Sequence, residues 1–168
     1  MSIIAKRPES NYTPAPEGLH HAVAVDVIDL GVLQTNWGDK HKVRLVWQIE
    51  EENAETGRRF EVRKQYNLSL HEKATLRKDL EAWRGRKFTD EELKGFDLEK
   101  LLGANAQVQV VQDISEDGSI YANVQAVVPA PKNVAKLHPQ DYVRVKDRPQ
   151  QQGNGPVPRK DEDDDIPF

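Results

Sequence analysis

Seven cationic side chains are concentrated between residues 40 and 64 of this 168-residue chain. They are Lys40, Lys42, Arg44, Arg58, Arg59, Arg63 and Lys64. Ammonium and guanidinium groups at this density can bind a chain of phosphates, with an affinity that falls as salt is added. Those at positions 42, 44, 59 and 63 occupy the outward face of two predicted strands, where they can converge. The alternative is a solvated strand face on which Glu50 and Glu61 pair with these cations.

Three aromatic side chains are candidates for stacking on unpaired bases, which contributes about 1–3 kcal/mol per base. Trp37 lies in a predicted loop, Tyr66 ends a predicted strand, and Tyr121 lies on the polar side of another. Trp37 could instead plug one end of the domain, and Tyr121 could be an ordinary half-exposed strand residue. Trp47 and Trp83 continue apolar patterns and are predicted to be core residues.

The last eight residues combine five carboxylates with an apolar end. A basic pocket with a hydrophobic floor could hold the terminal side chain and the α-carboxylate together. We therefore predict a partner-docking site formed by Asp163, Asp164, Asp165, Ile166, Pro167 and Phe168. The alternative is a solvated acidic end that aids solubility.

Alternating apolar residues predict three strands in the first half of the chain. The first begins near residue 19 and is expected to end near Gly31. The second covers 42–50, with one face in the core and the other solvated. The third covers 59–66 and follows a turn at 55–57.

A helical region follows these strands. Ser69 and Glu72 have the spacing of a capping box, and Leu76, Leu80 and Trp83 repeat at helical intervals. The pattern predicts a helix that buries these three apolar side chains.

Further signals complete the order of elements. Thr89 and Glu92 repeat the capping-box spacing, and 97–102 predicts another helical turn. Two strands, 106–110 and 120–128, are joined by a predicted turn at 117–118.

This order predicts a mainly β domain with a helical insertion, β-β-β-α(α)-β-β, which is the order of a five-stranded OB-fold barrel. We place the OB-fold domain at 18–128, after a flexible N-terminal arm, 1–17. A Pro/Gln/Gly-rich linker, 129–160, precedes the acidic tip, 161–168, and its early part could dock on the domain or on a neighbouring subunit. Both tails are predicted to be disordered.

Composition excludes several classes of function. The chain has no cysteine, so disulfides and thiolate chemistry are ruled out. His20, His21, Asp26 and Asp29 do not have the spacing of a known metal site. No nucleophile elbow or phosphate-binding glycine loop is present. With no apolar leader or membrane-length window, we predict a non-catalytic protein without metal or cofactor, in the cytoplasm of a bacterial host.

Residues 163–168, Asp-Asp-Asp-Ile-Pro-Phe, resemble the C-terminal tip of bacterial and phage single-stranded DNA-binding proteins of the SSB type. Segments 65–74 and 83–89 are similar to phage-encoded OB-fold proteins that bind single-stranded DNA, and this similarity can span 18–128. The resemblance implies sequence-tolerant DNA binding and protection in replication, recombination or repair, with partner enzymes recruited by the tip.

The alternative reading is an interaction adaptor whose OB-like domain binds protein and whose tail docks it to replication proteins. The net charge of −4 favours the adaptor, whereas the cations and aromatic residues favour DNA. The sequence leaves open whether the chain forms a homo-oligomer and whether it prefers DNA or RNA.

Overall fold

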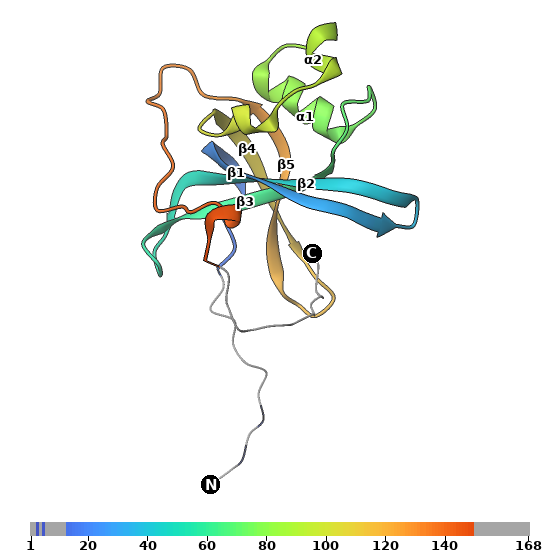
Figure 1. The fold of residues 1–168 in the computed structure, drawn as a ribbon. Coiled ribbons are helices and arrows are strands. Elements are labelled where there is room, and N and C mark those ends of the chain that lie inside the picture. The colour runs from blue at the N-terminus through green and yellow to red at the C-terminus, as the bar shows by residue number, and fades with distance from the viewer. Residues whose placement is uncertain (1–2, 4, 6–12, 150–168) are drawn as a thin grey trace.

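The architecture is a five-stranded antiparallel sheet with a few short helices, seen in a computed structural model that describes residues 3, 5 and 13–149 (Figure 1). The prediction of a mainly β domain with helices between the third and fourth strands is confirmed. The spatial order of the strands is β3-β2-β1-β4-β5, so the sheet is open and β3 and β5 are its edges. The strands are β1 (Gly18–Thr35), β2 (Gly38–Asn53), β3 (Arg58–Asn67), β4 (Asn105–Ile114) and β5 (Ile120–Pro129).

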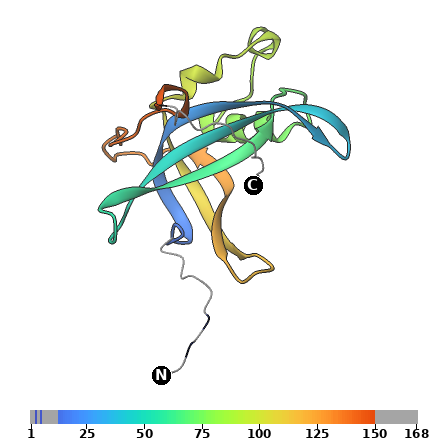
Figure 2. The ribbon, with the colours of Figure 1, turned by 60° about the horizontal axis from the view of Figure 1, so that its bottom comes forward.

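Strand β1 bends the whole sheet because it pairs with two neighbours along different parts of its length. Its first part pairs with β4, and its longer second part pairs with β2. The register with β2 shifts between Ala24 and Asp26 and again between Asp29 and Gly31, and such bulges bend and twist a strand. The sheet therefore coils, and its edges β3 and β5 come into contact (Figure 2).

The first strand is longer than predicted. Gly31, with φ 74°, lies at a register shift inside β1, and its N–H donates to Asp29 Oδ1 at 2.8 Å. The strand continues to Thr35, and the β1–β2 hairpin projects from the body of the molecule (Figure 1). The glycine marks a bulge, which a glycine in a strand often does.

The helices gather beyond one end of the sheet (Figure 1): α1 (Thr75–Arg84), α2 (Asp90–Lys94) and the 3-10 helix η1 (Leu98–Leu101). Helix α1 buries Leu76, Leu80 and Trp83, as predicted. Its predicted start was wrong, because the helix begins after Ala74 without a side-chain cap, and Ser69 Oγ accepts from His71 N in a turn. The second capping box is present at the start of α2. No helix in 13–149 has the length and apolar character to span a membrane.

The main core lies between the inner face of the sheet and α1. Trp47, Ile49 and Val108 are fully buried there, and the Trp47 and Trp83 rings lie 5.9 Å apart between centroids. Burial of each large apolar side chain contributes about 1.5–3 kcal/mol. The packing fixes α1 against β5 and thereby the position of the edge strands.

A second, smaller core lies on the outer face of the sheet. Val23, Val25 and Val46 are buried there against Leu137 and Tyr142. The prediction of a solvated outer face on β2 is therefore wrong at Val46 and Gln48, which a later part of the chain covers. We call that covering segment, residues 137–148, the strap; it includes the 3-10 helix η2 (Val145–Asp147).

Polar side chains hold the strap at both ends. Near its start, Asn105 Nδ2 donates to Leu137 O at 3.0 Å, and Leu137 N donates to Asn105 Oδ1 at 2.7 Å. Gln48 makes the same reciprocal pair of bonds with the backbone of Gln140. An amide side chain thus replaces a neighbouring strand in satisfying the strap backbone.

The strap's C-terminal part is fixed by Asp26, a carboxylate that is only 1% exposed. It accepts hydrogen bonds from Tyr142 Oη at 2.6 Å, Val145 N at 2.9 Å and Arg144 Nε at 3.0 Å. Burial raises the pKa of Asp26, but these donors outweigh burial and hold it below its usual value. Arg144 also forms a two-pronged ion pair with Glu99 of η1, at 2.6 and 2.8 Å.

Candidate nucleic-acid interface

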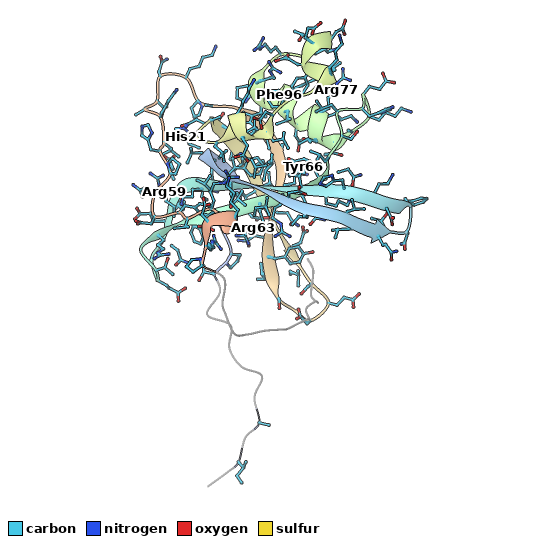
Figure 3. The ribbon with its side chains drawn as sticks, in the orientation of Figure 1. His21, Arg59, Arg63, Tyr66, Arg77 and Phe96 are labelled. Carbon is cyan, nitrogen blue, oxygen red and sulfur yellow. The ribbon has the colours of Figure 1, made fainter. Side chains whose placement is uncertain are left out.

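A cleft of about 600 Å³ opens where the two edges of the sheet approach each other. It is lined by Arg44 from β2, by Arg63, Lys64 and Gln65 from β3, and by Asn123 and Val124 from β5. The positive side chains therefore come from β2 and β3, and β5 contributes a polar and an apolar one. Arg63 lies near the middle of the molecule, close to the crossing of β3 and β5 (Figure 3).

Two further hollows continue the cleft along β3. One, of about 690 Å³, lies between the β1–β2 hairpin and the β3–α1 connection and shares Lys64 and Gln65 with the cleft. The other, of about 300 Å³, lies at the start of β3 and shares Arg63 with it. We call the three together the β3 groove.

All seven cations predicted from the sequence line this groove. Arg58, Arg59 and Arg63 line one end, Arg44, Arg63 and Lys64 the centre, and Lys40, Lys42 and Lys64 the other end. Lys73, from the β3–α1 connection, lines the same end as Lys40 and was not among the predicted cations. Only the packing of that connection against β2 brings it close, so no local pattern pointed to it.

The centre of the groove contains two neighbouring guanidinium groups. Arg44 lies opposite Gln65 and Arg63 opposite Val46, so the two arginines are diagonal neighbours on the outer face. Burial lowers the pKa of Arg44, and the positive charge of Arg63 lowers it further. A bound anion would favour the charged form of both arginines, because its opposite charge offsets their mutual repulsion.

The cations differ in how firmly the protein already holds them. Lys64 Nζ lies 2.7 Å from Asp79 Oδ2, and Arg59 Nη1 donates to the strap at His138 O at 2.7 Å. Arg63 is 3.6 Å from Glu61 in an exposed ion pair, which contributes at most about 1 kcal/mol. Within 13–149, no carboxylate forms a salt bridge with Lys40, Lys42 or Arg58. Lys40, Lys42 and Arg58 can therefore bind a phosphate without breaking an ion pair.

Trp37 is displayed at the tip of the β1–β2 hairpin, where it is 87% exposed. Thr35 Oγ1 accepts from Trp37 N at 3.1 Å and donates to Gly38 O at 2.6 Å, which fixes the two-residue turn. Because the ring contacts no core, the prediction of a plug is wrong. The hairpin holds a large apolar ring in solvent, three residues before Lys40 in the sequence.

The two tyrosines have different environments. Tyr121 on β5 is 42% exposed and lies two residues from Asn123, so both side chains belong to one face of the strand. Tyr66 is 2% exposed, and its hydroxyl donates to Asp79 Oδ2 at 2.7 Å. Burial raises the pKa of Tyr66, and the negative charge of Asp79 raises it further. The prediction that Tyr66 stacks on a base is therefore wrong, because its ring belongs to the core under α1.

The predicted docking tip, 163–168, lies outside the described residues. Within those that are described, no group of three or more His, Asp or Glu side chains is arranged to hold a metal ion. His41 Nε2 and Asp29 Oδ1 are 2.6 Å apart and form a pair at the base of the hairpin.

No protein-family model matches the chain, and no curated protein sequence matches it.

Proposed function

We propose that this chain binds and protects single-stranded DNA without strong sequence preference, in replication, recombination or repair. The β3 groove carries the proposal, because one continuous surface presents seven cations. Exposed aromatic rings lie on the neighbouring β1–β2 hairpin, at Trp37, and on β5, at Tyr121. Such surfaces suit a single strand, whose phosphates follow cations and whose bases stack on flat side chains. The protein acts without catalysis, in the cytoplasm of a bacterial, phage-infected cell.

The strand arrangement supports an OB-like barrel as the framework. The central position of β1, its bulges and the contact between β3 and β5 are features of a five-stranded, partly open barrel. In such barrels the face of the second and third strands binds oligonucleotides, together with the loops that join strands one to two and four to five. Arg44 and Arg63 lie on that face, and Trp37 lies in the first of those loops.

We propose a path for the single-stranded DNA along these residues. Phosphates run past Lys42, Arg44 and Arg63, and bases reach Trp37 at one side and Tyr121 at the other. Arg63 and Arg44 together hold a phosphate, which ends their mutual repulsion. The acidic tip, 161–168, recruits partner enzymes to the coated strand, as its resemblance to SSB-type tips implies.

Fluorescence anisotropy of a labelled oligo(dT) titrated with the full chain at several salt concentrations tests the proposal. We expect log affinity to fall linearly with log salt, with a contribution to the slope of about 0.7 for each phosphate contact. Arg63→Gln should weaken binding and flatten the slope by about that amount. Its unfolding free energy should stay within about 0.5 kcal/mol of the wild type, because the exposed Glu61 pair contributes little.

Lys78→Gln is the matched control. Lys78 is an exposed cation on α1 that lines none of the three hollows, so its removal should change neither the affinity nor the slope. An affinity that ignores salt, or equal losses in both variants, would count against the groove and favour the adaptor function.

A further inference from the structure

A small apolar pocket lies away from the β3 groove, among the helices. It has a volume of about 290 Å³ and is lined by Leu80, Trp83, Arg84, Phe88, Phe96, Leu101, Ala104 and Asn105. Phe96 marks its place beside α1 and η1 (Figure 3). None of the cations in the groove lines it, so DNA binding does not account for it.

One residue that lines this pocket has a polar atom without an acceptor. The Arg84 guanidinium lies over the Phe88 ring at 4.7 Å, and its Nη2 donates to Glu92 Oε2 at 2.7 Å. Its Nη1 is buried, and no described residue accepts a hydrogen bond from it. A buried donor of this kind favours a ligand that brings an oxygen acceptor.

The size and chemistry of the pocket restrict its ligand. Ligand sites for drug-sized molecules are about 300–1,000 Å³, so this pocket suits little more than one aromatic side chain. Phe88 and Phe96 already pack edge to face at 5.2 Å, and a third ring can join such a cluster. The complementary ligand is an aromatic residue that carries a carboxylate at a chain end.

The chain itself ends in such a residue. Phe168 carries both a ring and the α-carboxylate, and it is the 19th residue after residue 149. A peptide of that length spans at most about 60 Å, which exceeds the width of a domain of this size. The start of the strap lies beside the pocket, because Leu137 is bound to Asn105, which lines the pocket, and Arg144 farther along the strap is bound to Glu99 of η1.

We propose that the pocket captures the chain's own C-terminal residue, with the Phe168 ring among Trp83, Phe88 and Phe96 and its α-carboxylate on Arg84. The captured tip is withheld from other proteins until a partner with higher affinity displaces it. Capture does not depend on DNA binding, so each can fail without the other.

A fluorescein-labelled peptide of residues 161–168, titrated by anisotropy into full-length chains, tests this latch. Binding to the Phe168→Ala chain should be at least ten-fold tighter than to the wild type, whose own tip competes at high effective concentration. A peptide ending in alanine, or one with an amidated C-terminus, should bind the Phe168→Ala chain at least ten-fold more weakly. Both peptide changes leave the protein untouched, so they remain informative whatever a pocket mutation does to folding.

Protein variants locate the contact. Phe96→Ala, made in the Phe168→Ala chain, should lower peptide affinity at least ten-fold, and Arg63→Gln in the groove should leave it unchanged. The latch is overturned by equal peptide affinity for both chains, by indifference to amidation, or by loss through Arg63→Gln instead of Phe96→Ala. Dimerisation of the wild type that Phe168→Ala abolishes would also overturn it, since it would assign the pocket to a second copy's tip.

Discussion

Trp37 is highly exposed, and we propose that its ring stacks on a base of the bound DNA. A ring held in water by a short, well-bonded turn adds nothing to the core, so its removal should not lower stability. We expect Trp37→Ala to weaken oligo(dT) binding by about 1–3 kcal/mol, the contribution of one stacked base. Trp37→Phe, which keeps a flat ring, should retain most of the affinity. If a folded Trp37→Ala chain bound oligo(dT) as tightly as the wild type, the proposed stacking on Trp37 would be wrong.

At the residue scale, strand periodicity predicted most of the candidate site and failed where a distant residue decides the environment. The cations at 42, 44 and 63 face outward because apolar neighbours alternate with them. Tyr66 was misjudged because its partner Asp79 lies on a helix that packs over it, and the Tyr66 hydroxyl bonds to that carboxylate. Lys64 shares Asp79, which makes it partly a structural residue.

At the scale of elements, the predicted ends of strands and helices rested on residue patterns that fit two different structures. Gly31 could end a strand or permit a bulge, and only pairing with β2 shows that it does the second. Ser69 with Glu72 could cap a helix or form a turn, and the turn bond from His71 N shows which occurs. By contrast, Thr89 with Glu92 makes both capping bonds, since no competing turn intervenes.

The strap depends on the ionised form of Asp26, and this makes its stability depend on pH. Asp26 has a lowered pKa in the folded chain, so its stabilising contribution is complete above the ordinary Asp pKa of about 3.9 and is lost as pH falls through the lower, folded value. Asp26→Asn should reduce the unfolding free energy near pH 7 by about 2–3 kcal/mol, because bonds to a charged acceptor are lost.

Urea unfolding of the wild type and Asp26→Asn between pH 7 and pH 3 measures this effect. The difference between the two chains should shrink as the pH falls below about 4. Asp113→Asn is the control, because Asp113 is exposed and, among the described residues, accepts a hydrogen bond from Asn123 alone. A constant difference over the whole range would show that the Asp26 charge does not hold the strap.

For the whole molecule, the strap makes the folded unit longer than the strand pattern predicted. The sequence placed the domain end at 128, because the strap has no periodicity and its contacts are side chains reaching across the sheet. A chain that stops at 128 should lose about 3 kcal/mol or more of unfolding free energy, since Val23, Val25 and Val46 would be exposed. A chain that stops at 148 should unfold at nearly the wild-type temperature. Similar thermal unfolding of both truncated chains would contradict this.

The proposed functions of Phe168 and of the β3 groove involve different partners, so binding of DNA and recruitment of proteins should be separable. Phe168→Ala removes the apolar anchor and keeps all five acidic side chains and the terminal carboxylate. Affinity for oligo(dT) should stay within two-fold, whereas replication and repair proteins recovered from bacterial lysate with the wild type should be lost. If the variant recovers the same proteins, the side chain of Phe168 is not the anchor. The acidic run would then act by charge alone, and its captured proteins should be released by moderate salt.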